Sequence, residues 1–167
     1  AMQYLAGAGV GKLVVVDGDR LEASNLHRQT WYALADCGTP KAQLAAARIR
    51  ALNPEVEVTT HAMRLDARNA AQLLRGCDVV LDCTDNFETR HAINLACVTH
   101  AKPLVSGAAL RLDGQVAVYD TRMPEAPCYA CVFPATENFE ETRCATMGVL
   151  APLVGVIGSL QATEALK

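Results

Sequence analysis

The stretch DVVLDCTDNFETR (residues 78–90) begins as an apolar run and then places Asp82, Asp85, Asn86 and Glu88 within one short turn. An apolar run followed at once by polar residues is typical of a strand buried in a sheet. Short β-branched runs of this kind alternate along the chain with Ala- and Leu-rich segments. The sequence therefore predicts an α/β fold with a doubly wound, mainly parallel sheet and helices on both faces.

The expected elements follow this alternation. We expect strands at residues 12–16, 56–60, 78–82, 103–105 and 115–119, and helices at residues 41–52, 68–74 and 89–101. Residues 107–114 are expected to form a turn, and residues 123–142 an exposed excursion rich in Pro, Glu and Asn. The uncharged run at 149–160 is shorter than the roughly 20 residues of a membrane span, so we expect a core helix there.

The composition favours a single soluble globular domain, with 51% hydrophobic and 5% aromatic residues among 167. A formal net charge of −3 gives no basic field for a nucleic-acid backbone. No basic segment of a secretory signal opens the chain, and 7 cysteines, an odd number, do not suggest a disulfide framework. These features favour the reducing cytoplasm, with neither nucleic acid nor membrane as a partner.

The acidic turn after residue 82 lies where a doubly wound sheet binds ligands, at the carboxyl end of a strand. Clustered carboxylates repel one another, and a bound Mg²⁺ would relieve that repulsion while bridging to phosphate oxygens. We assign Asp85 to this site because it lies in the loop, whereas Asp82 still belongs to the strand. Asn86 is placed in the same site, although capping the next helix is the commoner role of such a residue.

Two polar segments follow the first strand. In LVVVDGD, Asp17 ends an apolar run as the ribose-binding acid does in a dinucleotide fold, and Asp19 comes two residues later. A turn-forming Asp is the alternative. The short polar run SNLHRQ can present the side chains of Asn25, Arg28 and Gln29 to one binding site, where an arginine can bind phosphate oxygens in bidentate fashion. A solvated loop with a surface ion pair is the alternative there.

Lys41 breaks a local rule in GTPKAQ (residues 38–43). Thr39 suits an N-cap and Pro40 suits the first helical position. Lys41 then lies in the first turn, where the helix dipole disfavours a cation. A bound anion would explain this placement, and a snorkelling surface lysine is the alternative.

Together these segments resemble the MoeB/ThiF/HesA family, bacterial relatives of the ubiquitin-activating enzymes, and most of all its molybdopterin-synthase adenylyltransferase branch. The matching motifs run in family order: LVVVDGDRLEASNLHRQ, GTPKA, VVLDCTDNFETR, PLVSGAALRLDGQV, CYAC and GVLAPLVGVIGSLQATEALK. The resemblance implies a Rossmann-like fold that binds ATP. It places Asp17 on the ribose, Asn25, Arg28 and Lys41 on the phosphates, and Asp85 on the metal-bound triphosphate.

The resemblance also implies a reaction. The C-terminal glycine carboxylate of a ubiquitin-like sulfur-carrier protein, at the end of a Gly-Gly tail, attacks the α-phosphate of ATP to give an acyl-adenylate and pyrophosphate. Because a carboxylate is already ionised at neutral pH, positioning and charge stabilisation suffice. The expected context is molybdopterin- or thiamine-type sulfur transfer by a homodimer that uses Mg²⁺, with a sulfurtransferase as a further partner.

Two departures from the family matter. The family begins with a strand and a glycine-rich phosphate loop and supplies an arginine to its partner subunit, whereas this chain begins inside the helix that follows that loop. Cys128 and Cys131 resemble half of a four-cysteine Zn²⁺ site, without a second CxxC before Lys167. We therefore expect an incomplete adenylation domain over residues 1–167, with an exposed loop at 123–147. Two incidental thiols are the alternative.

Cys144 lies in that loop, near the start of a helix that would stabilise a thiolate. The resemblance places the cysteine of sulfur-transfer or thioester chemistry at this position, and an unreactive thiol is the alternative. The cysteines beside apolar segments are expected to be small core residues; these are Cys37, Cys77, Cys83 and Cys97.

Three other functions stay open. A nicotinamide-dependent dehydrogenase would use Asp17 but would not explain Lys41, Asp85 and the cysteine pair together. A tRNA-modifying, ATP-dependent dehydratase of the same superfamily would keep the ATP site. A non-catalytic module could bind a ubiquitin-like protein without activating it.

Overall fold

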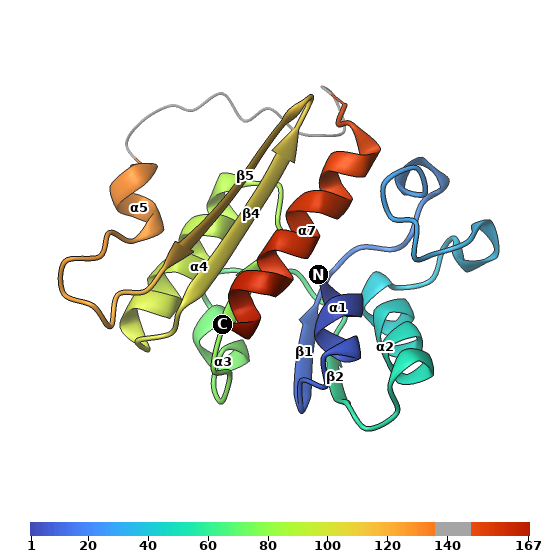
Figure 1. The fold of residues 1–167 in the computed structure, drawn as a ribbon, viewed down its shortest axis with the longest axis horizontal. Helices are drawn as coiled ribbons and strands as arrows, with labels where there is room; N and C mark the ends of the chain where they lie inside the picture. The colour runs from blue at the N-terminus through green and yellow to red at the C-terminus, as the bar shows by residue number, and fades with distance from the viewer. Residues whose placement is uncertain (136–147) are drawn as a thin grey trace. The chain divides into compact units, whose positions relative to one another are not determined.

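The computed structural model describes residues 1–135 and 148–167. These residues form two compact units, Ala1–Leu65 and Asp66–Lys167, whose helices and strands are labelled in Figure 1. Each unit contains a pair of parallel strands together with helices, so the α/β prediction is confirmed. That residues 1–167 act as one adenylation domain stays a prediction.

The first unit is built on two parallel strands. β1 (Lys12–Val16) pairs with β2 (Glu57–His61) from one end to the other. α2 (Lys41–Leu52) connects the strands, and α1 (Met2–Gly7) packs against α2. The core of this unit is formed by buried Ala6, Ile49 and Val56.

A long loop between β1 and α2 is closed at its base. Leu21 donates its N–H to the carbonyl of Thr39 at 3.0 Å and accepts the N–H of Gly38 at 2.8 Å. The Leu21 side chain is buried, which fixes this closure. The loop itself contains two short 3-10 helices, η1 (Ala23–Asn25) and η2 (Leu34–Asp36). Both ends of the loop therefore lie next to the first turn of α2.

The second unit is built on a three-stranded sheet in the order β3-β4-β5. β3 (Val80–Asp82) is parallel to β4 (Leu104–Leu110), which is antiparallel to β5 (Asp113–Tyr119). The helices are α3 (Ala70–Leu73), α4 (Phe87–Thr99), α5 (Tyr129–Val132) and α7 (Ala151–Leu166). α4 and α7 cover opposite faces of this sheet (Figure 1).

The prediction of a turn at residues 107–114 was wrong. Residues 107–110 belong to β4 and residues 113–114 to β5, so the turn shrinks to Arg111 and Leu112. The cause is pairing, because β4 and β5 pair in antiparallel register as far as Leu110 and Asp113. Packing adds a constraint at Gly107, where a Cβ would lie only 2.3 Å from the side-chain carbon Cδ of Gln161. Gly107 thus lets α7 approach the strand closely, and this contact is invisible in the local sequence.

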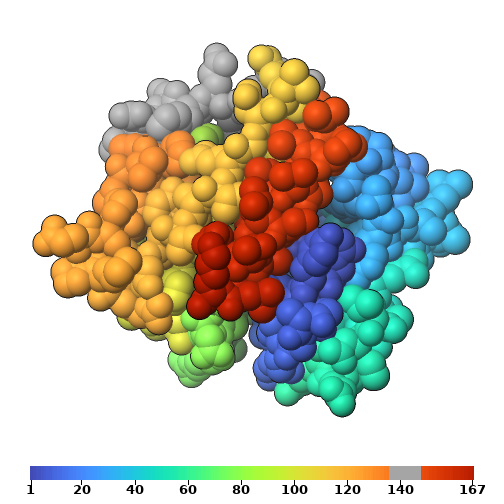
Figure 2. All heavy atoms as spheres, in the orientation of Figure 1, coloured from blue at the N-terminus to red at the C-terminus, as the bar shows by residue number. Residues whose placement is uncertain are grey.

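The predicted core helix exists as α7, but it is buried on one side only. Ile157, Gln161 and Ala162 are buried, whereas Val156 is 54% exposed, and Figure 2 shows α7 in red at the surface of the second unit. Of the cysteines expected in the core, Cys97 is buried as predicted. Cys37 and Cys77 are half-buried, and Cys83 is exposed, so that prediction was wrong for Cys83.

The other boundaries differ little from the predicted ones. The strand at 12–16 and the helix at 41–52 agree at both ends, and the second strand is displaced by one residue. Pro40, rather than Thr39, is the N-cap of α2. Among the described residues, no helix has both the length and the apolar character needed to span a bilayer.

Candidate functional site

The carboxyl end of β1 forms a tight acidic turn. Asp17 follows the last strand residue, and its Oδ1 accepts the backbone N–H of Asp19 at 2.9 Å. Between them, a Cβ on Gly18 would lie 2.8 Å from the backbone nitrogen of Arg64. Because backbone atoms cannot move aside as a side chain can, only glycine fits there. The turn therefore presents two carboxylates from a rigid base.

Lys41 is tied to this turn by two bonds. Its ammonium lies 3.1 Å from Oδ2 of Asp19, and its backbone N–H donates to the carbonyl of Asp19 at 2.9 Å. The Lys41 side chain is only 12% exposed, whereas that of Asp19 is 61% exposed. Asp19 thus supplies an anion that offsets a cation at a helix N-terminus. The misplaced lysine of the sequence is explained first by an internal partner, and it is not a snorkelling surface side chain.

Some polar groups of the loop that carries Asn25, Arg28 and Gln29 form hydrogen bonds within the loop itself. Asn25 is 8% exposed, and its Oδ1 accepts the N–H of Glu22 at 3.3 Å. Nη1 of Arg28 donates to the carbonyl of Ser24 at 3.2 Å. Oε1 of Gln29 is buried and accepts no hydrogen bond from any described residue. Asn25 therefore shapes the loop, and Gln29 keeps an acceptor that a ligand or water can use.

Tyr32 belongs to the same end of the first unit, although no motif pointed to it. Burial, and next the negative charge of Asp17, raise the pKa of Tyr32 to about 12. The phenol therefore stays protonated and lies within electrostatic reach of Asp17. Only tertiary packing could have revealed this, since Tyr32 stands outside every polar run of the sequence.

In the second unit, the acidic turn after β3 contains one closed carboxylate. Asp82 is 1% exposed, and its Oδ2 accepts Nη1 of Arg90 at 3.0 Å. Its Oδ1 accepts both the N–H of Thr84, at 2.9 Å, and the hydroxyl of Thr84, at 2.7 Å. The predicted repulsion between clustered carboxylates is therefore absent at Asp82, because Arg90 neutralises it.

Asp85 and Asn86 follow at the start of α4. The Asp85 carboxylate is exposed, and no described residue bonds to it. Asn86 is the N-cap of α4, and its Oδ1 accepts the N–H of Thr89 at 2.9 Å. An open carboxylate is a suitable oxygen ligand for Mg²⁺, so the metal-binding role of Asp85 is compatible with this geometry and stays a prediction. Asn86 has the capping role that was its alternative.

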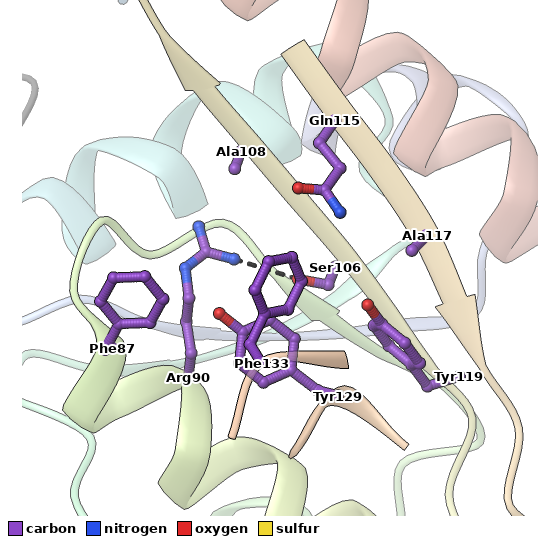
Figure 3. Close-up of a pocket in the computed structure, with 9 residues that line it drawn as sticks. All are labelled: Phe87, Arg90, Ser106, Ala108, Gln115, Ala117, Tyr119, Tyr129 and Phe133. Carbon is purple, nitrogen blue, oxygen red and sulfur yellow. Dashed lines mark hydrogen bonds between the residues drawn. The ribbon is translucent and has the colours of Figure 1, made fainter. Parts of the chain in front are cut away.

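A cavity of about 110 Å³ opens beside Arg90 on the α4 side of the sheet (Figure 3). Four of its nine lining residues are aromatic; the wall is formed by Phe87, Arg90, Ser106, Ala108, Gln115, Ala117, Tyr119, Tyr129 and Phe133. Tyr129 meets Tyr119 edge to face, with ring centroids 5.9 Å apart. Tyr129 is itself buried, so the described part of the predicted excursion includes a residue that packs into the unit.

The cysteine pair lies at the start of α5. The Sγ atoms of Cys128 and Cys131 are 3.7 Å apart, and two thiolates on a tetrahedral zinc with bonds of about 2.3 Å would be about 3.8 Å apart. The spacing fits a zinc site. Burial opposes ionisation, but hydrogen bonds from Asn94 and Cys131 hold the pKa of Cys128 below its ordinary value. Within the described ranges, no three His, Cys, Asp or Glu side chains gather as a metal site.

The predicted site residues thus fall into three groups. Asp17, Asp19 and Lys41 are brought together at the end of β1, with Asn25, Arg28 and Gln29 on the loop that closes beside them. Asp85 and Asn86 lie in the second unit, and so do Cys128 and Cys131. Cys144 lies outside the described residues. Arg90 and Tyr32 are the residues that sequence reasoning missed.

Three curated proteins resemble the whole chain or nearly all of it. It is 51% identical over 168 residues to "Adenylyltransferase and sulfurtransferase MOCS3" of Drosophila grimshawi, covering 100% of this chain and 37% of that protein. It is 49% identical to "SAMP-activating enzyme E1" of Haloferax volcanii, covering 100% and 61%. It is also 49% identical to "Sulfur carrier protein adenylyltransferase" of Thermus thermophilus, covering 99% and 63%. The chain therefore spans less than two thirds of these relatives.

Solved structures share the fold. A crystal structure of E. coli MccB with MccA-N7isoASN has a TM-score of 0.80 at 21% identity, over 99% of this chain and 51% of that one. E. coli tRNA N6-threonylcarbamoyladenosine dehydratase, TcdA, in complex with ATP has a TM-score of 0.63 at 32% identity, over 65% and 46%. The likeness to MccB confirms the Rossmann-like fold. The profile of the ThiF family matches residues 1–167, and the chain belongs to this family.

Proposed function

We propose that the protein containing this chain uses ATP to adenylate the C-terminal glycine carboxylate of a ubiquitin-like sulfur-carrier protein. Membership of the ThiF family and the names of the curated relatives support an adenylyltransferase that acts on sulfur carriers. The observation that carries the proposal is the grouping of Asp17, Asp19 and Lys41 at the carboxyl end of β1. This is the position where sheets of this class bind nucleotides.

The residues of the first unit would bind the nucleotide. Asp17 accepts hydrogen bonds from the ribose hydroxyls. Oε1 of Gln29, on the loop that follows β1, is a further acceptor for the nucleotide. Lys41 and Arg28 place positive charge on the phosphates, and the ammonium of Lys41 exchanges its exposed partner Asp19 for a phosphate oxygen. Asn25 keeps the loop in shape through its buried amide.

The chemistry needs positioning rather than a base. The glycine carboxylate attacks the α-phosphorus, the bond to the bridging oxygen breaks, and pyrophosphate leaves with the electron pair. Negative charge grows on the phosphate oxygens as this happens, so fixed cations stabilise the transition state. Mg²⁺ held by Asp85 would supply further positive charge at the triphosphate.

Further parts of the proposal concern assembly and later steps. Cys128 and Cys131 would hold Zn²⁺ with a second thiol pair elsewhere in the full-length protein, which would act as a homodimer. Cys144 would take part in sulfur or thioester transfer with a sulfurtransferase, after the adenylate has formed. The pathway would be molybdopterin- or thiamine-type sulfur transfer in the cytoplasm.

ATP–pyrophosphate exchange by the full-length protein tests the adenylation step. We expect exchange with ubiquitin-like carriers that end in Gly-Gly, and none with carriers that lack the last glycine. Asp85→Ala should abolish exchange, while Asp78→Ala, at the other end of the same stretch and also exposed, should leave it unchanged. Exchange that needs no carrier but follows added tRNA would favour the dehydratase. Carrier binding without exchange would favour the non-catalytic module.

A further inference from the structure

Arg90 is the hub of the second unit's polar contacts. Nη1 donates to Oδ2 of Asp82 and to the hydroxyl of Ser106, both at 3.0 Å. Nη2 donates to the carbonyl of Thr84 and, at 2.9 Å, to the carbonyl of Gly107. The four acceptors come from the end of β3, the loop after it and the middle of β4. One side chain of α4 therefore holds three segments together.

Although Arg90 borders the cavity in Figure 3, it is not available to bind an anion. Its side chain is 8% exposed, and its charge is paired with a carboxylate that is 1% exposed. Both terminal nitrogens are already occupied by acceptors of the chain. A phosphate could reach them only by leaving Asp82 buried and unpaired, which is strongly destabilising. Arg90 is therefore suited to hold protein rather than ligand.

The segment that Arg90 holds leads directly to Asp85. Thr84 is fixed by Arg90 through its carbonyl and by Asp82 through its N–H and hydroxyl. From the α7 side, Nε2 of Gln161 donates to the carbonyl of Asp82 at 2.8 Å. On the other side of Asp85, Asn86 caps α4. Asp85 thus stands between two anchored neighbours, while no residue in the described part of the chain bonds to its own carboxylate.

We propose that Arg90 is a positioning residue that presets Asp85 for its ligand. The inference rests on the proposed function, in which Asp85 binds the metal-bound phosphates of ATP. A turn whose backbone is already held in place loses less conformational entropy when the metal binds. A metal-binding carboxylate that is misplaced by about 1 Å loses much of its effect.

The substitution Arg90→Lys tests this with the charge retained. Lysine presents three N–H groups from one nitrogen, so it can pair with Asp82 but cannot reach all four acceptors of the guanidinium fork. We expect the Mg²⁺ concentration at half-maximal ATP binding, measured by calorimetry on the full-length protein, to rise by about tenfold or more. Backbone amides of residues 82–86 should exchange hydrogen faster, while those of β5 keep the rate of the unchanged protein.

Two further variants make the result specific. Arg122→Lys is the same change at an exposed ion pair with Asp120, 2.6 Å apart, and should alter neither measurement. In an Asp85→Asn background, Arg90→Lys should cause no further rise in the Mg²⁺ midpoint, because its effect passes through Asp85. Additive shifts in the double variant would show that Arg90 acts elsewhere and would overturn the inference.

Other outcomes separate this inference from the proposed function. If the Mg²⁺ midpoint of Arg90→Lys is unchanged, the positioning role is refuted. If backbone hydrogen exchange is then faster throughout the sheet, Arg90 contributes only to the general stability of the unit. Protein that binds Mg·ATP but never exchanges pyrophosphate would contradict adenylation alone, and the midpoint would still decide the role of Arg90. Protein that binds no ATP at any Mg²⁺ concentration would overturn both.

Discussion

Each unit places an acid–cation pair at the carboxyl end of a strand, with the cation on the helix that follows. Asp19 and Lys41 are 3.1 Å apart, with the acid side chain 61% exposed and the lysine side chain 12% exposed. Asp82 and Arg90 are 3.0 Å apart, with side chains 1% and 8% exposed. The distances are alike, so burial makes the difference. In the open pair solvent already competes for the Asp19 carboxylate, so a ligand can take its place beside Lys41.

The closed pair has no such freedom. A buried charge that loses its partner keeps the full penalty of desolvation, so Arg90 cannot be drawn away from Asp82 by an incoming phosphate. Arg90 instead donates hydrogen bonds to the backbone carbonyls of Thr84 and Gly107. In the proposed function, binding would therefore fall to the open pair and positioning to the closed pair, and variants of each pair should fail in different ways.

The largest effect on stability is expected from breaking the closed pair. Arg90→Ala leaves the Asp82 carboxylate buried without a cation and should lower the free energy of unfolding by about 3–5 kcal/mol. Urea denaturation of the full-length protein measures this. Arg122→Ala, at the exposed pair with Asp120, should change it by less than about 1 kcal/mol. Similar losses at both sites would show that burial does not separate them.

Breaking the open pair should affect catalysis and spare the fold. Lys41→Ala removes a cation from the phosphates and should lower carrier-dependent pyrophosphate exchange by about 10². Because the Lys41 side chain is 12% exposed, the loss of its packed stem should lower the free energy of unfolding by about 1 kcal/mol, which is less than the loss expected for Arg90→Ala. Lys12→Ala, at an exposed pair with Glu57 at the far end of β1, serves as the control. A loss of stability as large as that of Arg90→Ala would make this a second closed pair.

A smaller effect is expected where α7 supports the closed pair. Gly107→Ala places a methyl group against the Gln161 side chain and should lower the free energy of unfolding by about 1–3 kcal/mol. Because the clash involves one side chain, Gln161→Ala in the same protein should recover part of this loss. Denaturation of both single variants and the double variant gives the coupling. Strict additivity would mean that α7 does not approach β4 as closely as described.

The smallest effect concerns Tyr32 beside the open pair. Its folded pKa of about 12 lies above the ordinary 10.0, so the folded state retains the proton better than the unfolded chain. Its contribution to stability is therefore present below about pH 10 and is lost as the pH rises toward 12. Asp17→Asn removes a negative charge and should lower this pKa in a titration of tyrosinate absorbance. Tyr32→Phe identifies the signal, and an unchanged pKa would separate Tyr32 from Asp17.

The sequence predicted the open region better than the closed one. β1 and α2 were placed correctly at both ends because their signals are local: a β-branched run in one case, and Ala and Leu residues after a proline in the other. Asp17 and Lys41 stood out for the same reason, since one ends a strand and the other breaks a rule of helix ends. Their common partner, Asp19, is two residues from Asp17 but 22 from Lys41, so the second contact has no local sign in the sequence.

The closed region depends on contacts between segments that no local pattern signals. Gly107, Ala108 and Ala109 have little strand preference, and their place in β4 comes from antiparallel pairing with β5, with Gly107 packed against Gln161 of α7. Asp82 resembled one acid among several because nothing near it in sequence shows that Arg90 turns back onto the strand end. Asn94 likewise meets Cys128 and Tyr129 only through the fold. Contacts between segments, rather than propensities, decide this region.

The link between Gln161 and Asp82 joins residues 79 positions apart, and this separation bears on the order of folding. Closing so long a loop loses chain entropy before any contact compensates, so such contacts form late. On a ribosome, Asp85 emerges long before α7 does. The turn that carries it would mature only when α7 docks. If Asp85 acts as proposed, competence to bind ATP would then depend on completed synthesis of this part of the chain.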